Sequence, residues 1–385
     1  MTAALSSYRS WGGIAARGSE IVDARSWLDA PHRHRGPALA YGNGRSYGDS
    51  CLNDGGALID TRGLDDIFFF DRETGLLTCG AGLMLDRLLE FTVPAGWFPP
   101  VTPGTSFVTI GGALANDVHG KNHHRAGTFG NHVRALELVR SDGQRLICAP
   151  DLNPDLFAAT IGGFGLTGLV TQVTLQLMPI ASPEMEQEVL HFDGLPRFFE
   201  IAAESDATHD YTVAWIDSLA DGRHFGRGIF FRANHAPASG EPPPRGTRSL
   251  PFPLTPPFPL INRMTLRVFN WLYRNGQPRN GATQRVPYRP FFYPLDRVND
   301  WNRAYGPKGL RQFQCVVPMA QAREAVGEML RRTLSAGESS FLTVLKLFGS
   351  KPSPGLMSFP MPGATLTLDF PNRGERTARL LADLD

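Results

Sequence analysis

The chain has 385 residues, 42% of them hydrophobic and 19% charged, and this composition excludes a disordered polypeptide. The 38 Lys and Arg residues nearly balance 37 Asp and Glu residues, and the net charge of +1 excludes a nucleic-acid-binding protein that relies on a basic surface. No apolar run predicts a membrane-spanning helix, no secretory signal is apparent, and four cysteines without zinc or disulfide spacing favour reduced thiols and a cytoplasmic protein.

The first half of the chain predicts short strands separated by glycine-rich turns. One helix is predicted at 83–91, where leucines recur at helical spacing before Pro94. Strands are predicted at 37–41, 57–60, 67–70, 133–139 and 169–177. Because Pro179 closes this block, we place a domain boundary near residue 183.

The second half begins with strands and is interrupted by a proline-rich segment. Nine prolines between positions 237 and 259 cannot all fit inside a helix or sheet, so an extended flap is predicted over 237–260. Helices are predicted at 320–334 and 375–385. Strands are predicted at 186–192, 211–216, 228–231, 343–348 and 364–370.

A helix that follows the flap has two interpretations. Ile261, Met264, Val268 and Leu272 share one helical face. A basic stripe runs along another face, made by Arg263, Arg267 and Arg274. The pattern is typical of an amphipathic helix that packs on the core, and also of a surface that meets a membrane or a lipid substrate.

Three short motifs match known active-site patterns, and the surrounding sequence argues against each. The G-x-S-x-G motif at 44–48 is followed by turn-forming residues and lacks the helix that a hydrolase needs. The G-x-G-x-x-G motif at 163–168 leads into a strand, which disfavours a nicotinamide-type Rossmann domain. Four histidines within 119–132 lie among glycines without a carboxylate, so we expect a polar pocket and no metal site.

Two glycine-rich loops, at 41–49 and 103–124, are the strongest functional signal. Glycines allow the backbone to pass close to a ligand, and free backbone N–H groups can hold phosphate oxygens. Neither loop carries the lysine of a Walker motif. Two such loops after short strands therefore favour a long diphosphate cofactor that lies along the domain.

At these loops the chain resembles the vanillyl-alcohol-oxidase-type flavoproteins, whose FAD-binding domain is of the p-cresol-methylhydroxylase (PCMH) type. The most specific motif is His119-Gly-Lys-Asn-His-His124, followed by Gly130-Asn-His-Val133. Within the family the match is to oxidases of polyprenylphosphoryl ribose. Further matches run in order along the chain: Gly44-Arg-Ser-Tyr-Gly-Asp49, Pro103-Gly-Thr105, Gly165-Leu-Thr-Gly168, Trp301-Asn-Arg-Ala-Tyr-Gly306 and Leu345-Lys-Leu-Phe-Gly349.

The resemblance implies an α+β fold of two lobes, with a PCMH-type FAD-binding domain over 1–183 and a substrate domain built on an antiparallel sheet over 184–385. FAD would lie in the first lobe with its isoalloxazine ring at the interface. Covalent members attach the flavin through a histidine in the first loop, and positions 41–50 contain none, so non-covalent FAD is expected. The implied cofactor-binding residues are Tyr41, Gly42, Asn43, Gly44, Arg45, Ser46, Tyr47, Gly48, Asp49, Gly104, Thr109, Ile110, Gly111, Gly112, Asn116, Asp117, His119 and Val170.

The implied reaction is oxidation of a secondary sugar hydroxyl to a ketone, with the 2′-hydroxyl of a polyprenylphosphoryl-β-D-ribose as the expected substrate group. Lys121 would hold a developing negative charge, while His119 and Tyr47 would steer the proton. These three are the implied catalytic residues. The implied substrate contacts are Gln314, Lys346, Phe348 and Trp215.

The resemblance also implies partners and leaves alternatives open. A separate reductase would complete the epimerisation to arabinose. The residues of the flap and basic helix, for their part, suit a peripheral contact with the inner membrane. One alternative is an oxidase of free aldoses, alditols or aldonolactones. Another is a flavin-binding protein without catalysis, because the family's Tyr-x-x-Lys-Asp segment, which returns to the FAD domain, is not reached before Asp385.

Overall fold

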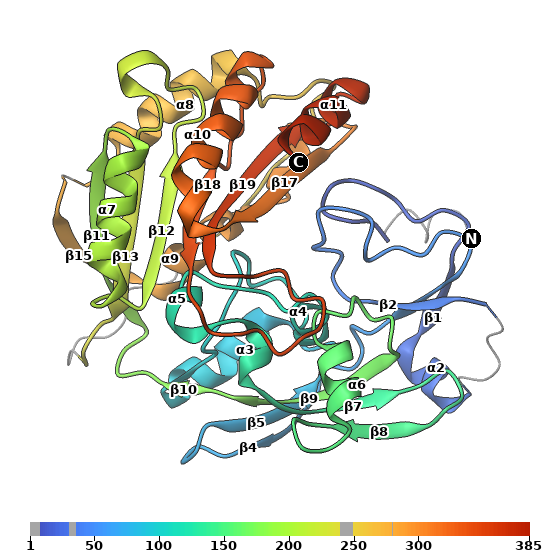
Figure 1. Cartoon of the computed structure of the whole chain (residues 1–385). Coiled ribbons are helices and arrows are strands. Elements are labelled where there is room, and N and C mark those ends of the chain that lie inside the picture. Colours follow the sequence, from blue (N-terminus) through green and yellow to red (C-terminus); the bar gives the residue numbers. More distant parts are fainter. Residues whose placement is uncertain (1–7, 31–35, 239–248, 279) are drawn as a thin grey trace.

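The computed structural model describes residues 8–30, 36–238, 249–278 and 280–385 (Figure 1). A small parallel sheet with the order β1-β3-β2 begins the fold. Its strands are β1 (Glu20–Asp23), β2 (Ala38–Tyr41) and β3 (Ala57–Asp60), and α2 (Ala24–Asp29) follows β1. Leu58 and Ile59 pack into different apolar clusters because successive strand residues face opposite sides of a sheet. The predicted strands at 37–41 and 57–60 are confirmed.

A five-stranded antiparallel sheet forms the base of the first lobe, with the order β4-β5-β9-β7-β8. Val173 and Leu175 are buried on one face of β9, while Thr174 and Gln176 are only half-buried on the other, as their alternation predicts. The tight turn between β7 and β8 has Gly143 at a φ of 87°. The strands are β4 (Ile67–Phe70), β5 (Leu76–Gly80), β7 (Val133–Val139), β8 (Arg145–Cys148) and β9 (Leu169–Gln176).

Short helices cover the inner face of this sheet. The predicted helix is confirmed as α3 (Leu85–Thr92), which buries its leucines and ends in η2 (Val93–Ala95) before Gly96 at a φ of 83°. Gly96 ends the helix because it takes a left-handed conformation that other residues avoid. The remaining helices are α4 (Ile110–Ala115), α5 (His123–Ala126), η3 (Phe129–His132) and α6 (Pro154–Thr160).

The second lobe is built on a seven-stranded sheet in which every neighbouring pair is antiparallel, with the order β15-β11-β13-β12-β18-β19-β17. This confirms the antiparallel sheet that the family resemblance implies. All five strands predicted after residue 183 are present. The seven strands are β11 (Glu184–Phe192), β12 (Tyr211–Ile216), β13 (Gly228–His235), β15 (Ala282–Pro287), β17 (Leu310–Val317), β18 (Val344–Phe348) and β19 (Gly363–Pro371).

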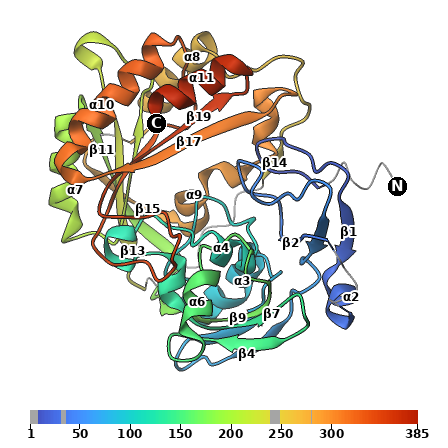
Figure 2. The same ribbon diagram turned by 45° about the vertical axis from the view of Figure 1, so that its right-hand side comes forward.

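The two faces of the seven-stranded sheet differ in chemistry. On the outer face, apolar residues such as Leu345 and Leu366 pack under α7 (Leu195–Asp206), α10 (Met319–Ser335) and α11 (Glu375–Leu384) (Figures 1 and 2). Because side chains alternate along a strand, the intervening residues face the first lobe. Several of these are polar: Gln312, Gln314, Lys346 and Thr367.

The two lobes share one apolar core. The ring of Phe98, from the short strand β6 (Trp97–Phe98), lies 5.1 to 5.6 Å from the rings of His235, Tyr288 and Phe292 of the second lobe. Tyr288 and Phe292 belong to α9 (Tyr288–Phe292). The chain passes from β10 (Met178–Pro179) to β11 across the boundary predicted near residue 183. That this boundary divides two domains stays a prediction.

The described part of the proline-rich flap leads into α8 (Arg263–Asn275). Its short strand β14 (Leu250–Pro251) pairs with β16 (Val298–Asn299), and the predicted flap residues 239–248 lie outside the described residues. Of the predicted apolar face, Ile261 is buried just before the helix begins, but a core-facing role for the helix itself is wrong, because Met264, Val268 and Leu272 are exposed. The helix instead buries the face that carries Leu266 and Asn270, where the Asn270 amide donates to the Asp217 carboxylate at 2.6 Å.

Candidate functional site

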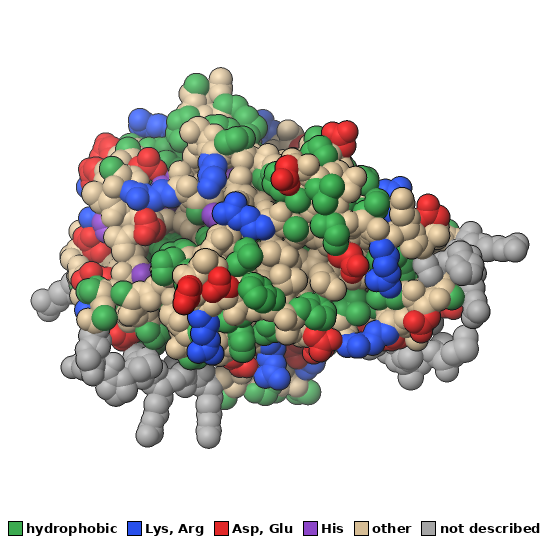
Figure 3. Space-filling view, turned by 90° about the horizontal axis from the view of Figure 1, so that it is seen from below, with side chains coloured by type: hydrophobic (Ala, Val, Ile, Leu, Met, Phe, Trp, Pro, Cys, Tyr) green, Lys and Arg blue, Asp and Glu red, His purple; other side chains and the backbone are tan. Residues whose placement is uncertain are grey.

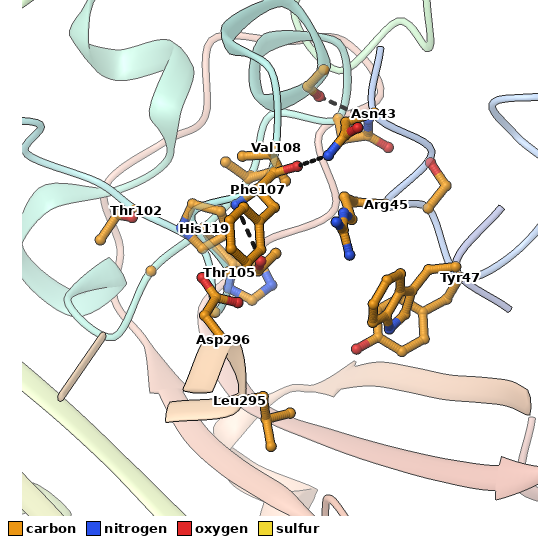
Figure 4. A pocket seen from close by; sticks show the side chains of 18 of the residues that line it. Asn43, Arg45, Tyr47, Thr102, Thr105, Phe107, Val108, His119, Leu295 and Asp296 are labelled. Atoms are coloured by element: carbon orange, nitrogen blue, oxygen red, sulfur yellow. Dashed lines mark hydrogen bonds between the residues drawn. The ribbon is translucent and has the colours of Figure 1, made fainter. Parts of the chain in front are cut away.

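A cavity of about 980 Å³ lies between the glycine-rich loops of the first lobe and the polar face of the seven-stranded sheet. This volume is at the upper end for ligand pockets and suits a long cofactor together with a substrate. Both predicted glycine loops line it, and so do residues from β12, β17, β18 and α8. The cavity thus lies where the two lobes meet (Figure 4).

The two glycine loops are held against each other. The side-chain amide of Asn43 donates to the backbone carbonyl of Phe107 at 2.8 Å (Figure 4). A Cβ on Gly42 would lie 2.4 Å from Oγ1 of Thr109, a distance that real Cβ atoms do not show. Glycine at position 42 is therefore required for the close approach of the loops.

The second loop is fixed at the start of α4. Oγ1 of Thr109 accepts from the N–H of Gly112 at 3.1 Å, and the N–H of Gly111 donates to Ala81 at 2.7 Å. A Cβ on Gly111 would lie 3.0 Å from atoms of Ala81. Gly104, by contrast, has no atom within 4 Å of a Cβ position, so its backbone borders open space at the cavity.

Arg45 projects from the first loop toward Phe107 (Figure 4). Its guanidinium carbon lies 4.2 Å from the ring centre of Trp11 and 5.2 Å from that of Phe107. Burial lowers the pKa of Arg45, and the charge of Asp296 is the largest influence that opposes this shift. Its Nε is buried and has no hydrogen-bond partner among the described residues. A partly buried cation with an unused donor on a cavity wall fits an anionic ligand such as a diphosphate.

His119 links the first lobe to the polar sheet. Nζ of Lys346 lies 3.2 Å from its Nδ1, and the side-chain amide of Gln314 lies 3.1 Å from its Nε2. Burial, and then the neighbouring Lys346, hold the pKa of His119 well below its usual value, so the ring is neutral. A neutral imidazole accepts a hydrogen bond at one nitrogen and donates from the other. If Lys346 donates to Nδ1, then Nε2 carries the hydrogen, and the amide oxygen of Gln314 accepts from it.

Two lysines on the cavity wall have pKa values close to neutrality. Burial lowers the pKa of Lys346 to about 8. Burial and the charge of Lys346 lower the pKa of Lys121 to about 7. The Lys121 amine donates to the carbonyl oxygens of Phe291 and Phe292, which lie at the end of α9. Both lysines can therefore change protonation state near neutral pH.

Tyr47 lies beside Trp301 of η6 (Trp301–Tyr305), with ring centres 6.5 Å apart. Burial is the main cause that raises the pKa of Tyr47 well above its usual value. Its phenol therefore stays protonated. Tyr47 can donate a hydrogen bond into the cavity, but it cannot act as a base near neutral pH.

Gln312 and Asp369 form a pair that we did not predict. Opposite each other on β17 and β19, they are joined by a 2.8 Å hydrogen bond from the Gln312 amide to the Asp369 carboxylate. Burial raises the pKa of Asp369 to about 7. Polar residues at alternate strand positions, 312 and 314 and then 365, 367 and 369, are the signal that could have revealed this polar face.

Most of the predicted site residues line the cavity, and five do not. Tyr41 is buried at the start of the first loop, and its hydroxyl donates to the backbone carbonyl of Arg9 at 2.8 Å. Ile110 is fully buried in the apolar core, and Phe348 packs against His119 and His123, with ring centres 4.8 and 4.3 Å away. The other two are Gly48 and Asp49. Those that line it are Gly42, Asn43, Gly44, Arg45, Ser46, Tyr47, Gly104, Thr109, Gly111, Gly112, Asn116, Asp117, His119, Lys121, Val170, Trp215, Gln314 and Lys346.

The clustered histidines point to different partners. His124 and His132 contact backbone carbonyls, of His209 at 3.0 Å and Ala126 at 2.9 Å, and His123 packs on Phe348. Within the described ranges, no three His, Cys, Asp or Glu side chains gather as metal ligands. The G-x-S-x-G motif is followed by turns, and the G-x-G-x-x-G motif leads into β9, so neither forms the site of its namesake family.

Comparisons with known proteins agree with this geometry. Residues 18–149 match the family model of an FAD binding domain. The chain is 38% identical to decaprenylphosphoryl-β-D-ribose oxidase of Mycolicibacterium smegmatis, over 86% of this chain and 74% of that protein. It is 35% identical to an uncharacterised protein of Streptomyces coelicolor, over 79% of this chain and 85% of that one. Identity to cytokinin dehydrogenase 2 of Arabidopsis thaliana is 27% over 36% of this chain and 27% of that protein.

The identities of 38% and 35%, each over more than three quarters of this chain, show to which family the chain belongs. The chain belongs to the FAD-dependent oxidoreductases of the vanillyl-alcohol-oxidase and PCMH type. The cavity fits the cofactor of this family, because its volume, the open backbone at Gly104 and the unpaired Nε of Arg45 together suit a long anionic molecule. Among the described residues, no helix has the length and apolar character to cross a bilayer.

Proposed function

We propose that the protein oxidises the 2′-hydroxyl of a polyprenylphosphoryl-β-D-ribose to a ketone, with FAD bound non-covalently. The observation that carries this proposal is the cluster of Lys346, His119 and Gln314 on the wall of the cavity that the glycine loops also line. The similarity to decaprenylphosphoryl-β-D-ribose oxidase supports the choice of substrate. Bound FAD supplies the acceptor for a hydride from the carbinol carbon.

Residues of the cavity wall accept the hydroxyl proton and position the groups that take part in the reaction. Neutral Lys346 takes up the hydroxyl proton, because its pKa of about 8 leaves an unprotonated fraction near neutral pH. His119 orients that amine through its 3.2 Å contact. Lys121 has the lower pKa, about 7, so it is also unprotonated where Lys346 is, and its amine contributes hydrogen bonding rather than positive charge to the same wall.

Three further side chains suit the sugar and its phosphate. Tyr47 and Gln312 offer a hydroxyl and an amide to the sugar hydroxyls. Arg45 offers an unused N–H to a phosphate, either of the cofactor or of the substrate. The ketone product would pass to a separate reductase that completes the epimerisation.

Anaerobic titration with a panel of substrates tests the reaction. Loss of flavin absorbance is expected with a polyprenylphosphoryl ribose, together with a product two hydrogens lighter by mass spectrometry. Loss of absorbance only with free aldoses, alditols or an aldonolactone would replace the proposal by the second class of oxidase. A protein that binds flavin and is reduced by none of these would be a flavin-binding protein without this catalysis.

Acid precipitation tests the attachment of the cofactor. Positions 41–50 contain no histidine, so flavin is expected in the supernatant after precipitation. Flavin that stays with the precipitated polypeptide would contradict non-covalent binding.

A further inference from the structure

The outer face of α8 is apolar and uncovered by the described residues. Met264, Val268, Trp271 and Leu272 lie on one side of the helix, and 76%, 58%, 63% and 56% of their surfaces are exposed. Single exposed apolar residues are common on proteins. Four large ones on one helical face are not, and such a face marks an interaction surface.

The flap extends this face along the chain. Leu250, Leu254 and Phe258 are all exposed, and the flap ends where the Leu260 carbonyl accepts from the Thr265 hydroxyl in the first turn of α8. We call these three residues and the four exposed apolar residues of α8 the α8 surface. It combines aliphatic side chains with Trp271 and Phe258, and aromatic rings of this kind are enriched at membrane interfaces.

The charge of this part of the chain has one sign. Residues 242–295 contain eight arginines and no Lys, Asp or Glu, although the whole chain has a net charge of only +1. On α8, Arg267 is exposed and makes no hydrogen bond or ion pair among the described residues, whereas Arg274 pairs with Asp193 at 3.1 Å. An apolar helical face beside an exposed arginine that has no acidic partner is complementary to an anionic bilayer.

The cavity lies behind the elements that carry the α8 surface. Tyr273, on the opposite side of α8, lines the cavity, and so does Val298 of β16, which pairs with Leu250. The far end of the molecule is different. There, hydrophobic side chains are interspersed with charges of both signs (Figure 3).

We propose that the α8 surface binds the surface of an anionic lipid bilayer. The apolar side chains of α8 and the flap enter the interfacial region, and Arg267 faces lipid phosphates. Binding at this place puts the cavity beside the membrane, where a lipid-linked substrate could enter without leaving the bilayer completely. The membrane contact does not depend on which substrate is oxidised.

Cosedimentation of the FAD-loaded protein with vesicles tests this surface. Binding is expected to mixed phosphatidylglycerol–phosphatidylcholine vesicles and to be much weaker with phosphatidylcholine alone or at high salt. The variant that combines Met264→Ser with Trp271→Ser should bind about tenfold or more weakly. A matched control combines Phe68→Ser with Phe69→Ser, two exposed residues of β4 in the first lobe, and should bind like the parent.

The charge contribution has its own pair of variants. Arg267→Gln should weaken binding and its salt dependence, whereas Arg72→Gln, an exposed arginine of the first lobe, should not. The proposal is overturned if the parent binds neither kind of vesicle, or if the α8 variant and its control bind equally. A parent that is dimeric in light scattering and becomes monomeric with the α8 changes would also overturn it, because a second copy would then cover this surface.

Discussion

Nζ of Lys346 lies 3.2 Å from Nδ1 of His119, and this contact joins strand β18 of the second lobe to the glycine-rich loop of the first. Burial affects both partners in the same direction, since it disfavours their charged forms. The pair is therefore less charged than the same residues in water. A cavity wall of this kind can accept a proton from a substrate at ordinary pH.

The first prediction concerns the pH dependence of the reductive step. Protonation removes the free amine of Lys346, whose pKa is about 8, so the rate of anaerobic flavin reduction should rise with pH through this value and level off above it. Below it, the rate should fall by up to about tenfold per pH unit. Stopped-flow absorbance measures this rate. Lys346→Met should abolish the pH-dependent step, while Lys308→Met, at an exposed lysine, should leave the profile unchanged.

The second prediction concerns the anion subsite at Arg45. Arg45→Gln removes a buried positive charge that stacks on Trp11, and flavin affinity or substrate affinity should fall about 10- to 100-fold, as for a lost charge-assisted hydrogen bond. Fluorescence of released flavin and KM distinguish the two ligands. Arg72→Gln is the control. Unchanged affinity for both ligands would show that the unused donor of Arg45 meets no anion.

The third prediction concerns the approach of the two loops at Gly42. Gly42→Ala places a Cβ where Thr109 already lies, so the loops must separate, and both flavin retention and melting temperature should fall. Gly36→Ala is the matched control, because no atom lies within 4 Å of its Cβ position. Equal flavin occupancy of the two variants would contradict a requirement for glycine at position 42.

The fourth prediction concerns the Gln312–Asp369 pair. Above the Asp369 pKa of about 7 the carboxylate accepts from the Gln312 amide, which leaves the amide oxygen for a substrate hydroxyl. Protonation of Asp369 as the pH falls removes this preference, so KM should rise below about pH 7, in addition to the fall in the rate of flavin reduction that protonation of Lys346 causes. Asp369→Asn should lose this dependence of KM on pH. Burial, and then the charge of Asp369, raise the pKa values of Tyr47 and Tyr305, so both stay protonated.

Local patterns in the sequence predicted many elements of the fold, but not the helix α7 or the strands β5, β15 and β17. Strand alternation located β9, and leucine spacing followed by Pro94 and Gly96 located α3. The glycines of both loops also identified the cavity wall. These features depend on residues that are close together in the chain, so the sequence alone carries enough information to predict them.

Long-range contacts were the part that the sequence could not predict. Trp11 meets Arg45 across 34 positions, and Gln312 meets Asp369 across 57, so no local spacing reports either contact. The buried face of α8 was also missed. On that face the Asn270 amide donates to the Asp217 carboxylate. This hydrogen bond joins residues far apart in the chain, so the hydrophobic periodicity of the helix does not report it.

The ring contacts of Phe98 have a consequence for how the molecule unfolds. Its aromatic neighbours His235, Tyr288 and Phe292 all come from beyond residue 183. Unfolding of either lobe would therefore expose apolar surface of the other lobe to water. Heat should therefore disrupt both lobes in a single cooperative transition. A fragment ended at residue 183 would lack these three rings, so it would expose Phe98 to water and would aggregate rather than retain flavin as an independent module.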